Sequence, residues 1–250
     1  MPRRTDLARL IEEINALAQH GPAITVEDVR RLLTKVRELA QTRMIEEGYD
    51  ADQVKKLSAK FRDAGRRSAP WRPVSSLVPG RPQTGADGNR ISRWLLPQDH
   101  KFYADEVTAT LVEIKFFLQA LSFNGAPSID DAEFQTAFTP WLVENPVLPD
   151  TYVEPIQLVP IELAPILADR RRITSGHIIP LDREGGTHVP KNVFLVYGRS
   201  NQLQGNMTLD ELLTLAERLV DEHKRRGTFP SVPIMPPESL IKSSSAVLES

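Results

Sequence analysis

The spacing of apolar residues predicts three helices within the first 64 residues. One apolar stripe runs at intervals of three and four residues from Leu7 to Leu17, which is the repeat of an amphipathic helix. A second stripe follows Thr25, which is placed as an N-cap, and continues until Gly48. Asp50 is placed to cap a third, shorter helix. Residues 1–64 are therefore predicted to form a helical region.

Residues 65–92 break this pattern and are predicted to form a Pro/Gly-rich linker or arm. Four prolines and four glycines lie between positions 65 and 90, with almost no periodicity. Because the start of this segment is basic and contains Trp71, two interpretations stay open. A solvated linker is favoured, since runs of charge are usually only solvated, and an arm that contacts phosphates is the alternative.

Residues 93–168 are predicted to form a helical and extended segment. A helical stripe covers about 101–123 and ends at Asn124-Gly125-Ala126-Pro127, and a second helix is expected over 131–144. Five prolines between 145 and 168 predict an extended crossing, with any strand at the edge of a sheet.

Two short β-prone runs follow and change the pattern. Ile173–Ile179 and Val193–Tyr197 are separated by a loop with Gly185 and Gly186, and a polar helix start follows at Ser200-Asn201. Thr208 and Glu211 form a capping box for a last helix over 208–226. The fold class predicted from these patterns is α+β and mainly helical, with a strand–loop–strand–helix unit near the C-terminus.

Composition narrows the function classes. The chain has no cysteine, which excludes a disulfide framework, a zinc site with thiolate ligands and a cysteine nucleophile. No apolar run approaches the roughly 20 residues that span a bilayer, and the N-terminus has no signal-peptide core. We therefore expect a cytoplasmic protein with no membrane partner. The tail, 228–250, is proline- and serine-rich and is expected to be extended or disordered.

Charge is unevenly distributed along the chain. The 31 basic and 33 acidic residues give a net charge of −2. Residues 1–100 carry +5, residues 101–168 carry −8 and residues 169–227 carry +2. Because binding to a polyanion depends on the local field, the near-neutral total does not exclude a nucleic acid.

The strand–loop–strand–helix unit contains a recognisable series of residues. The series is Gly176-His177-Ile178-Ile179-Pro180, then Gly185-Gly186, then Asn192-Val193, then Asn201. It resembles the HNH nucleases of the ββα-metal finger superfamily over about 35 residues. The resemblance implies that 169–227 is an HNH-like nuclease domain and that the protein is a metal-dependent endonuclease acting on double-stranded DNA. By analogy it is of the restriction type and works as a homodimer, with residues 1–64 serving dimerisation or DNA contact.

The resemblance also implies residue roles. His177 is the general base, since an imidazole with an ordinary pKa of about 6.5 accepts a proton near neutral pH. Asn201 is a ligand of one divalent cation, Mg²⁺ or Mn²⁺. Asn192 braces the loop that orients the His177 ring. Three glycines shape that loop: Gly176, Gly185 and Gly186.

Gly176 departs from the family pattern, which has an acidic metal ligand at this position. Three explanations stay open. Asn201 is the sole protein ligand, or another acid reaches the site, with Asp169 and Asp182 nearest in sequence, or the finger has decayed and only binds DNA.

Several cations surround the motif and are expected to bind DNA phosphates. They are Arg170, Arg171, Arg172, Lys191 and Arg199. His188 is expected to be a solvated loop residue, with a phosphate contact as the second interpretation. Two rival functions remain: a non-catalytic nucleic-acid-binding module, and a sequence-indifferent nuclease of DNA or RNA.

Overall fold

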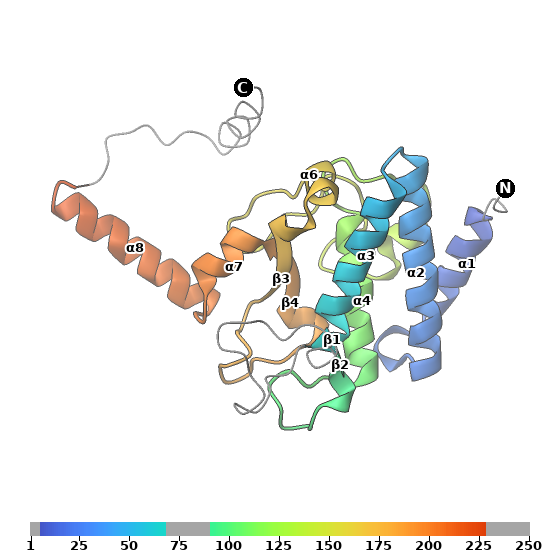
Figure 1. Ribbon diagram of the computed structural model, residues 1–250, viewed down its shortest axis with the longest axis horizontal. Helices are drawn as coiled ribbons and strands as arrows, with labels where there is room; N and C mark the ends of the chain where they lie inside the picture. The colour runs from blue at the N-terminus through green and yellow to red at the C-terminus, as the bar shows by residue number, and fades with distance from the viewer. Residues whose placement is uncertain (1–5, 69–90, 229–250) are drawn as a thin grey trace. The chain divides into compact units, whose positions relative to one another are not determined.

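The computed structural model describes residues 6–68 and 91–228 (Figure 1). Most of the predicted linker and nearly all of the predicted tail, 228–250, lie outside these residues. The fold class is α+β and mainly helical, as the sequence predicts. No helix among the described residues is both long enough and apolar enough to cross a membrane.

Four long helices pack side by side in the first half of the chain (Figure 1). They are α1 (Leu7–Ala18), α2 (Val26–Glu46), α3 (Ala51–Gly65) and α4 (Glu106–Ala120). Thr25 and Asp50 accept hydrogen bonds from the backbone N–H groups three residues on, so the predicted caps of α2 and α3 are confirmed. The predicted helix over 101–123 is confirmed as the shorter α4.

Helix α4 is the centre of this bundle, because every residue from Ala109 to Ala120 is buried. It therefore buries two charged side chains, and each has an ionic partner. Glu113 pairs with Arg66, just beyond the end of α3. Lys115 pairs with Glu144 and donates to the Pro190 carbonyl at 2.7 Å, so α4 is bonded to the segment that leads into the second strand of the motif.

Two antiparallel pairs of strands accompany the helices. Strand β3 (Ile173–His177) pairs with β4 (Val193–Tyr197), with Ile173 opposite Tyr197 and His177 opposite Val193. Strand β1 (Arg67–Ser68) pairs with β2 (Ile91–Ser92). This second pair was not predicted, and it joins the two ends of the segment 65–92.

The segment before β3 differs from its prediction. Helix α5 covers only Ala132–Ala137 instead of 131–144, because Pro140 disfavours a helical conformation in the residue before it. Helix α6 (Leu163–Ala168) forms where an extended crossing was predicted. Pro165 lies in its first turn, where the missing N–H is not needed.

The motif continues into α7 (Gly198–Gln204), and α8 (Leu209–Arg225) follows. Short 3₁₀ turns occur at η1 (Gly21–Ala23), η3 (Arg93–Leu95), η4 (Arg170–Arg172) and η5 (Pro190–Asn192).

One hydrophobic core extends from Leu10 in α1 to Leu195 in β4. Contacts group the described residues up to Leu209 into one compact unit and those from Asp210 to Thr228 into a second. The predicted segments 1–64, 93–168 and 169–227 each contribute residues to this core.

Candidate functional site

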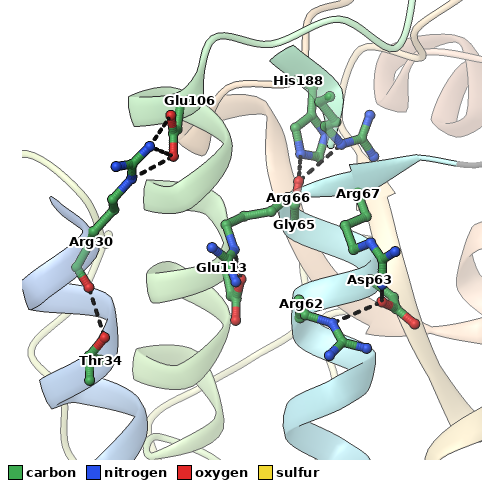
Figure 2. Close-up of polar contacts among 11 residues, drawn as sticks. Arg30, Thr34, Arg62, Asp63, Gly65, Arg66, Arg67, Glu106, Glu113 and His188 are labelled. Atoms are coloured by element: carbon green, nitrogen blue, oxygen red, sulfur yellow. Dashed lines mark hydrogen bonds and ion pairs between the residues drawn. The ribbon is translucent and has the colours of Figure 1, made fainter. Parts of the chain in front are cut away.

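His177 lies at the end of β3, where its ring meets a second histidine. The Nε2 atom of His177 is 3.2 Å from Nδ1 of His188. Nε2 of His188 is in turn 2.8 Å from the carbonyl oxygen of Gly65, and this second contact is drawn in Figure 2. Only 1% of His188 is exposed. The expectation that His188 is a solvated loop residue is therefore wrong, because its ring is held in the interior by hydrogen bonds at both nitrogens.

Arg93 is the third polar side chain of this buried group. Its guanidinium donates to the Gly65 carbonyl oxygen at 2.9 Å and also to those of Ala64 and Phe102. The contacts with Gly65 and Ala64 cap the C-terminal end of α3, where helix carbonyls lack intrahelical partners.

Both histidines are uncharged at neutral pH. Burial, with a smaller contribution from the Arg93 guanidinium, lowers the pKa of His177 to about 4. Burial, Arg93 and His177 also hold the pKa of His188 well below its ordinary value. A neutral imidazole has one unprotonated nitrogen, which is what a general base requires.

A cavity of about 510 Å³ opens beside His177, and most of the charged residues that line it are basic. One wall comes from α3 and β1, and the opposite wall comes from η4 and β3. Asp63 is its sole acidic lining residue within the described chain, and it is ion-paired with Arg62 and Arg67. Six cationic side chains line the cavity: Lys56, Lys60, Arg67, Arg93, Arg170 and Arg171. This concentration of positive charge suits a phosphate backbone.

Asn192 is bonded to the loop between the two strands. Its amide accepts a hydrogen bond from the N–H of Ile179 and donates to the carbonyls of Ile179 and Thr187. The backbone carbonyl of Asn192 also accepts a hydrogen bond from the N–H of Ile178, one register step beyond the last pair of β3 and β4. Within this loop, Gly185 has φ +77°, and a Cβ at Gly186 would lie 2.0 Å from the Pro180 carbonyl oxygen. Both positions therefore favour glycine.

Gly176 faces α7, and its surroundings explain why no acid stands there. A Cβ at this position would lie 3.5 Å from Oδ1 of Asn201, but 2.8 Å from a methyl group of Val196. A side chain at position 176, where the family has an acidic ligand, would therefore point towards Asn201, but a methyl group of Val196 fills that space.

The two acids nearest to the motif in sequence both have cationic partners of their own. Asp169 accepts hydrogen bonds from Arg171, which help to lower its pKa to about 2, and Asp182 is ion-paired with Lys101. Across 6–68 and 91–228 there is no group of three or more His, Asp or Glu side chains that could hold a metal ion. Asn201 does not line the cavity.

The structure therefore brings together only part of the predicted set. His177, Arg170 and Arg171 share the cavity, whereas Arg172, Lys191 and Arg199 are exposed outside its lining. The sequence interpretation missed the α3 wall, although Lys56, Lys60, Asp63 and Arg67 recur at helical spacing. No sequence signal marked Arg93 or the carbonyl of Gly65.

Comparison with known proteins adds little. No protein-family model matches the chain, and no curated protein sequence does. One similar solved structure is described as the crystal structure of a type II restriction endonuclease. It is 19% identical, with a TM-score of 0.48, over 68% of this chain and 78% of that one. This degree of likeness does not establish a function, so the proposals below rest on the geometry of the site.

Proposed function

We propose that this protein is an endonuclease that hydrolyses phosphodiester bonds in double-stranded DNA, with His177 as the general base. The observation that carries the proposal is a neutral, half-buried histidine lining a basic cavity. The cavity brings together a general base, which can activate a water molecule, and positive side chains, which can stabilise negative charge on the phosphate. Hydrolysis of a phosphodiester needs both. His177 is also the residue to which the HNH resemblance assigns the role of general base.

The chemistry follows from these groups. His177 takes a proton from a water molecule as the water oxygen attacks phosphorus, and the bond from phosphorus to the leaving oxygen breaks. That oxygen takes a proton from solvent. Arginine and lysine side chains around the phosphate stabilise the negative charge that develops in the transition state.

The two walls of the cavity divide the binding of the DNA backbone between them. Arg170 and Arg171 lie on the η4 wall, and Lys56 and Lys60 lie on the α3 wall. The planar guanidinium group of arginine can donate two hydrogen bonds to a pair of phosphate oxygens, whereas the ammonium group of lysine acts as a point charge. The bound strand is thereby held with a phosphate beside His177.

Dependence on Mg²⁺ or Mn²⁺ remains part of this proposal and is tested directly. Because residues 6–68 and 91–228 contain no group of three or more His, Asp or Glu side chains that could hold a metal ion, we assign no step to a cation. We also propose that the protein acts as a restriction-type endonuclease. One finger cuts one strand, so a double-strand cutter of this kind works as a symmetric dimer.

The test is cleavage of supercoiled plasmid by wild type and by His177→Ala, with Mg²⁺, with Mn²⁺ and with EDTA. We expect the variant to lose about 10² to 10⁴ in rate, which is the usual contribution of a general base. His20→Ala, which changes an exposed histidine, is the control and should cleave like wild type. Unimpaired cleavage by His177→Ala would falsify the assignment of the base.

The rival function is a nucleic-acid-binding module without catalysis, which the apolar contact at Gly176 favours. Wild type that binds plain and modified DNA but cleaves neither, with either cation, would support this rival. A smear of products in place of discrete bands would indicate a sequence-indifferent nuclease.

A further inference from the structure

The hydrogen bonds at Gly65, His188 and His177 form a chain whose direction can be deduced. A carbonyl oxygen only accepts, so the Nε2 atom of His188, 2.8 Å from the Gly65 oxygen, carries a proton. A neutral imidazole carries one proton, so Nδ1 of His188 is an acceptor. The Nε2 atom of His177, 3.2 Å away, must then be the donor. The unprotonated nitrogen of His177 is therefore Nδ1.

We propose that His188 is a positioning residue for His177. It links the Gly65 carbonyl to the His177 ring, so that His177 carries its proton on Nε2 and keeps Nδ1 unprotonated on the side of the cavity. Within residues 6–68 and 91–228 the structure gives Nδ1 of His177 no hydrogen-bond partner, and His177 lines the cavity. The catalytic meaning of this arrangement rests on the proposed function, but the protonation pattern itself does not.

Gly65, whose carbonyl begins this chain of hydrogen bonds, is held firmly in place. It is the last residue of α3, and a Cβ there would lie 2.8 Å from the backbone nitrogen of Glu113 in α4. The next residue, Arg66, is ion-paired with Glu113 (Figure 2). Helix carbonyls at a C-terminus carry partial negative charge, which strengthens the Gly65 oxygen as an acceptor.

Arg93 supports the chain in two ways. Its Nε donates to the same Gly65 oxygen, so that oxygen keeps one hydrogen bond even without His188. Its positive charge also disfavours protonation of His188. A doubly protonated His188 would point an N–H at the N–H of His177 and break the chain.

The rival interpretation is that His188 is only a packing residue, in which case the tautomer of His177 does not depend on it. Two substitutions separate the interpretations. His188→Leu places an apolar side chain in the interior and removes the hydrogen bonds to His177 and to the Gly65 carbonyl. His188→Asn places an amide oxygen near the position of Nδ1 and keeps the acceptor for His177.

The experiment is ¹⁵N–¹H correlation NMR of the imidazole nitrogens in the full chain at pH 7, without DNA or metal. Wild type should show both rings protonated on Nε2. His177 in His188→Leu should show both tautomers, and in His188→Asn it should remain protonated on Nε2. Loss of the His177 signals in His177→Ala assigns them. A wild-type His177 protonated on Nδ1, or an unchanged His177 tautomer in His188→Leu, would overturn the proposal.

Cleavage kinetics provide the second readout. His188→Leu should lower kcat by about tenfold or more, since a general base contributes roughly 10² to 10⁴, and should leave DNA affinity unchanged. His188→Asn should recover most of this loss. If wild type cleaves no DNA, the proposed function fails, while the NMR result still decides whether His188 sets the His177 tautomer.

Discussion

The surroundings of His177 favour a neutral imidazole at the expense of basicity. Burial and Arg93 lower its pKa to about 4, so nearly all of the protein has an unprotonated base at neutral pH. A bound phosphodiester brings negative charge to the cavity, which stabilises the imidazolium and raises the pKa of His177. The ring therefore becomes a stronger base only when substrate is bound, as a general base should be.

The first prediction concerns the pH dependence of cleavage. Since kcat/KM reports the free enzyme, its acid limb should follow the low pKa of His177. We expect kcat/KM to fall only as pH drops towards about 4 and to change little between pH 6 and 8. Initial rates of plasmid cleavage across pH 4.5–8 provide the measurement. A half-maximal rate near pH 6.5, the ordinary histidine value, would contradict it.

The second prediction concerns stability. His177 and His188 have lowered pKa values when folded, so below pH 6.5 the unfolded chain binds more protons than the folded one. The free energy of unfolding should therefore fall as pH drops from about 6.5 towards 4, by up to about 1.4 kcal/mol per pH unit for each histidine. Denaturation midpoints of wild type and His188→Asn at pH 7 and 5 test this.

The variant has one buried histidine fewer, so its stability should change less between the two pH values. His20→Ala, whose histidine is exposed, should behave like wild type and serves as the control. Equal losses of stability in wild type and His188→Asn would show that His188 is protonated to the same extent in both states.

At the scale of elements, α3 and α4 set the position of the site. The third prediction is that Gly65→Ala destabilises the protein by about 1–3 kcal/mol, the usual cost of an added methylene in a packed interior. The new Cβ would meet the backbone of Glu113 at 2.8–2.9 Å, so the helices must separate. Because this also moves the carbonyl that bonds to His188, cleavage should decline too.

Gly198→Ala is the matched control, since a Cβ there makes only ordinary contacts, the nearest being the Arg171 carbonyl oxygen at 3.5 Å. Chemical denaturation should give a clear loss for Gly65→Ala and little change for Gly198→Ala. Equal stability of the two variants would refute the argument that α3 and α4 approach closely at Gly65.

The sequence predicts elements where local physics decides them. Thr25 and Asp50 cap helices through side chains a few residues from their partners, and β4 has its predicted bounds. Helix α6 departs from the extended crossing that the five prolines predict, because Pro165 lies in the first turn of the helix, where proline is tolerated. The effect of a proline depends on its position within the helix, and the residue type alone does not indicate that position.

The contacts of the site depend on tertiary structure and could not be predicted in the same way. His188 and Gly65 are 123 positions apart, and nothing in either neighbourhood indicates the other. Lys115 lies in an apolar stripe, yet its ammonium group bonds to the Pro190 carbonyl and stacks on Phe194. The motif that marks His177 is local and includes the loop of His188, whereas the Gly65 carbonyl that bonds to His188 comes from α3.

At the scale of the whole molecule, the net charge of −2 conceals a basic cavity. Its cations come from three stretches that are distant in sequence: 56–67, Arg93 and 170–171. The acidic middle of the chain does not neutralise them, because several of its carboxylates are used internally. Glu113 pairs with Arg66, and Glu154 accepts from Ser200 and two backbone N–H groups.

The last prediction tests whether this cavity binds DNA, with two adjacent lysines of α3. Both Lys55 and Lys56 are exposed, but only Lys56 lines the cavity. Lys56→Glu and Lys55→Glu make the same change in net charge, so long-range attraction to DNA weakens equally in both variants.

If the cavity holds the DNA backbone, Lys56→Glu should bind DNA more weakly than Lys55→Glu. Its plot of log affinity against log salt should also be shallower by about 0.9, the value for one lost phosphate contact. Titrations at several salt concentrations measure both quantities, and matching affinities and slopes would place the bound DNA elsewhere on the protein.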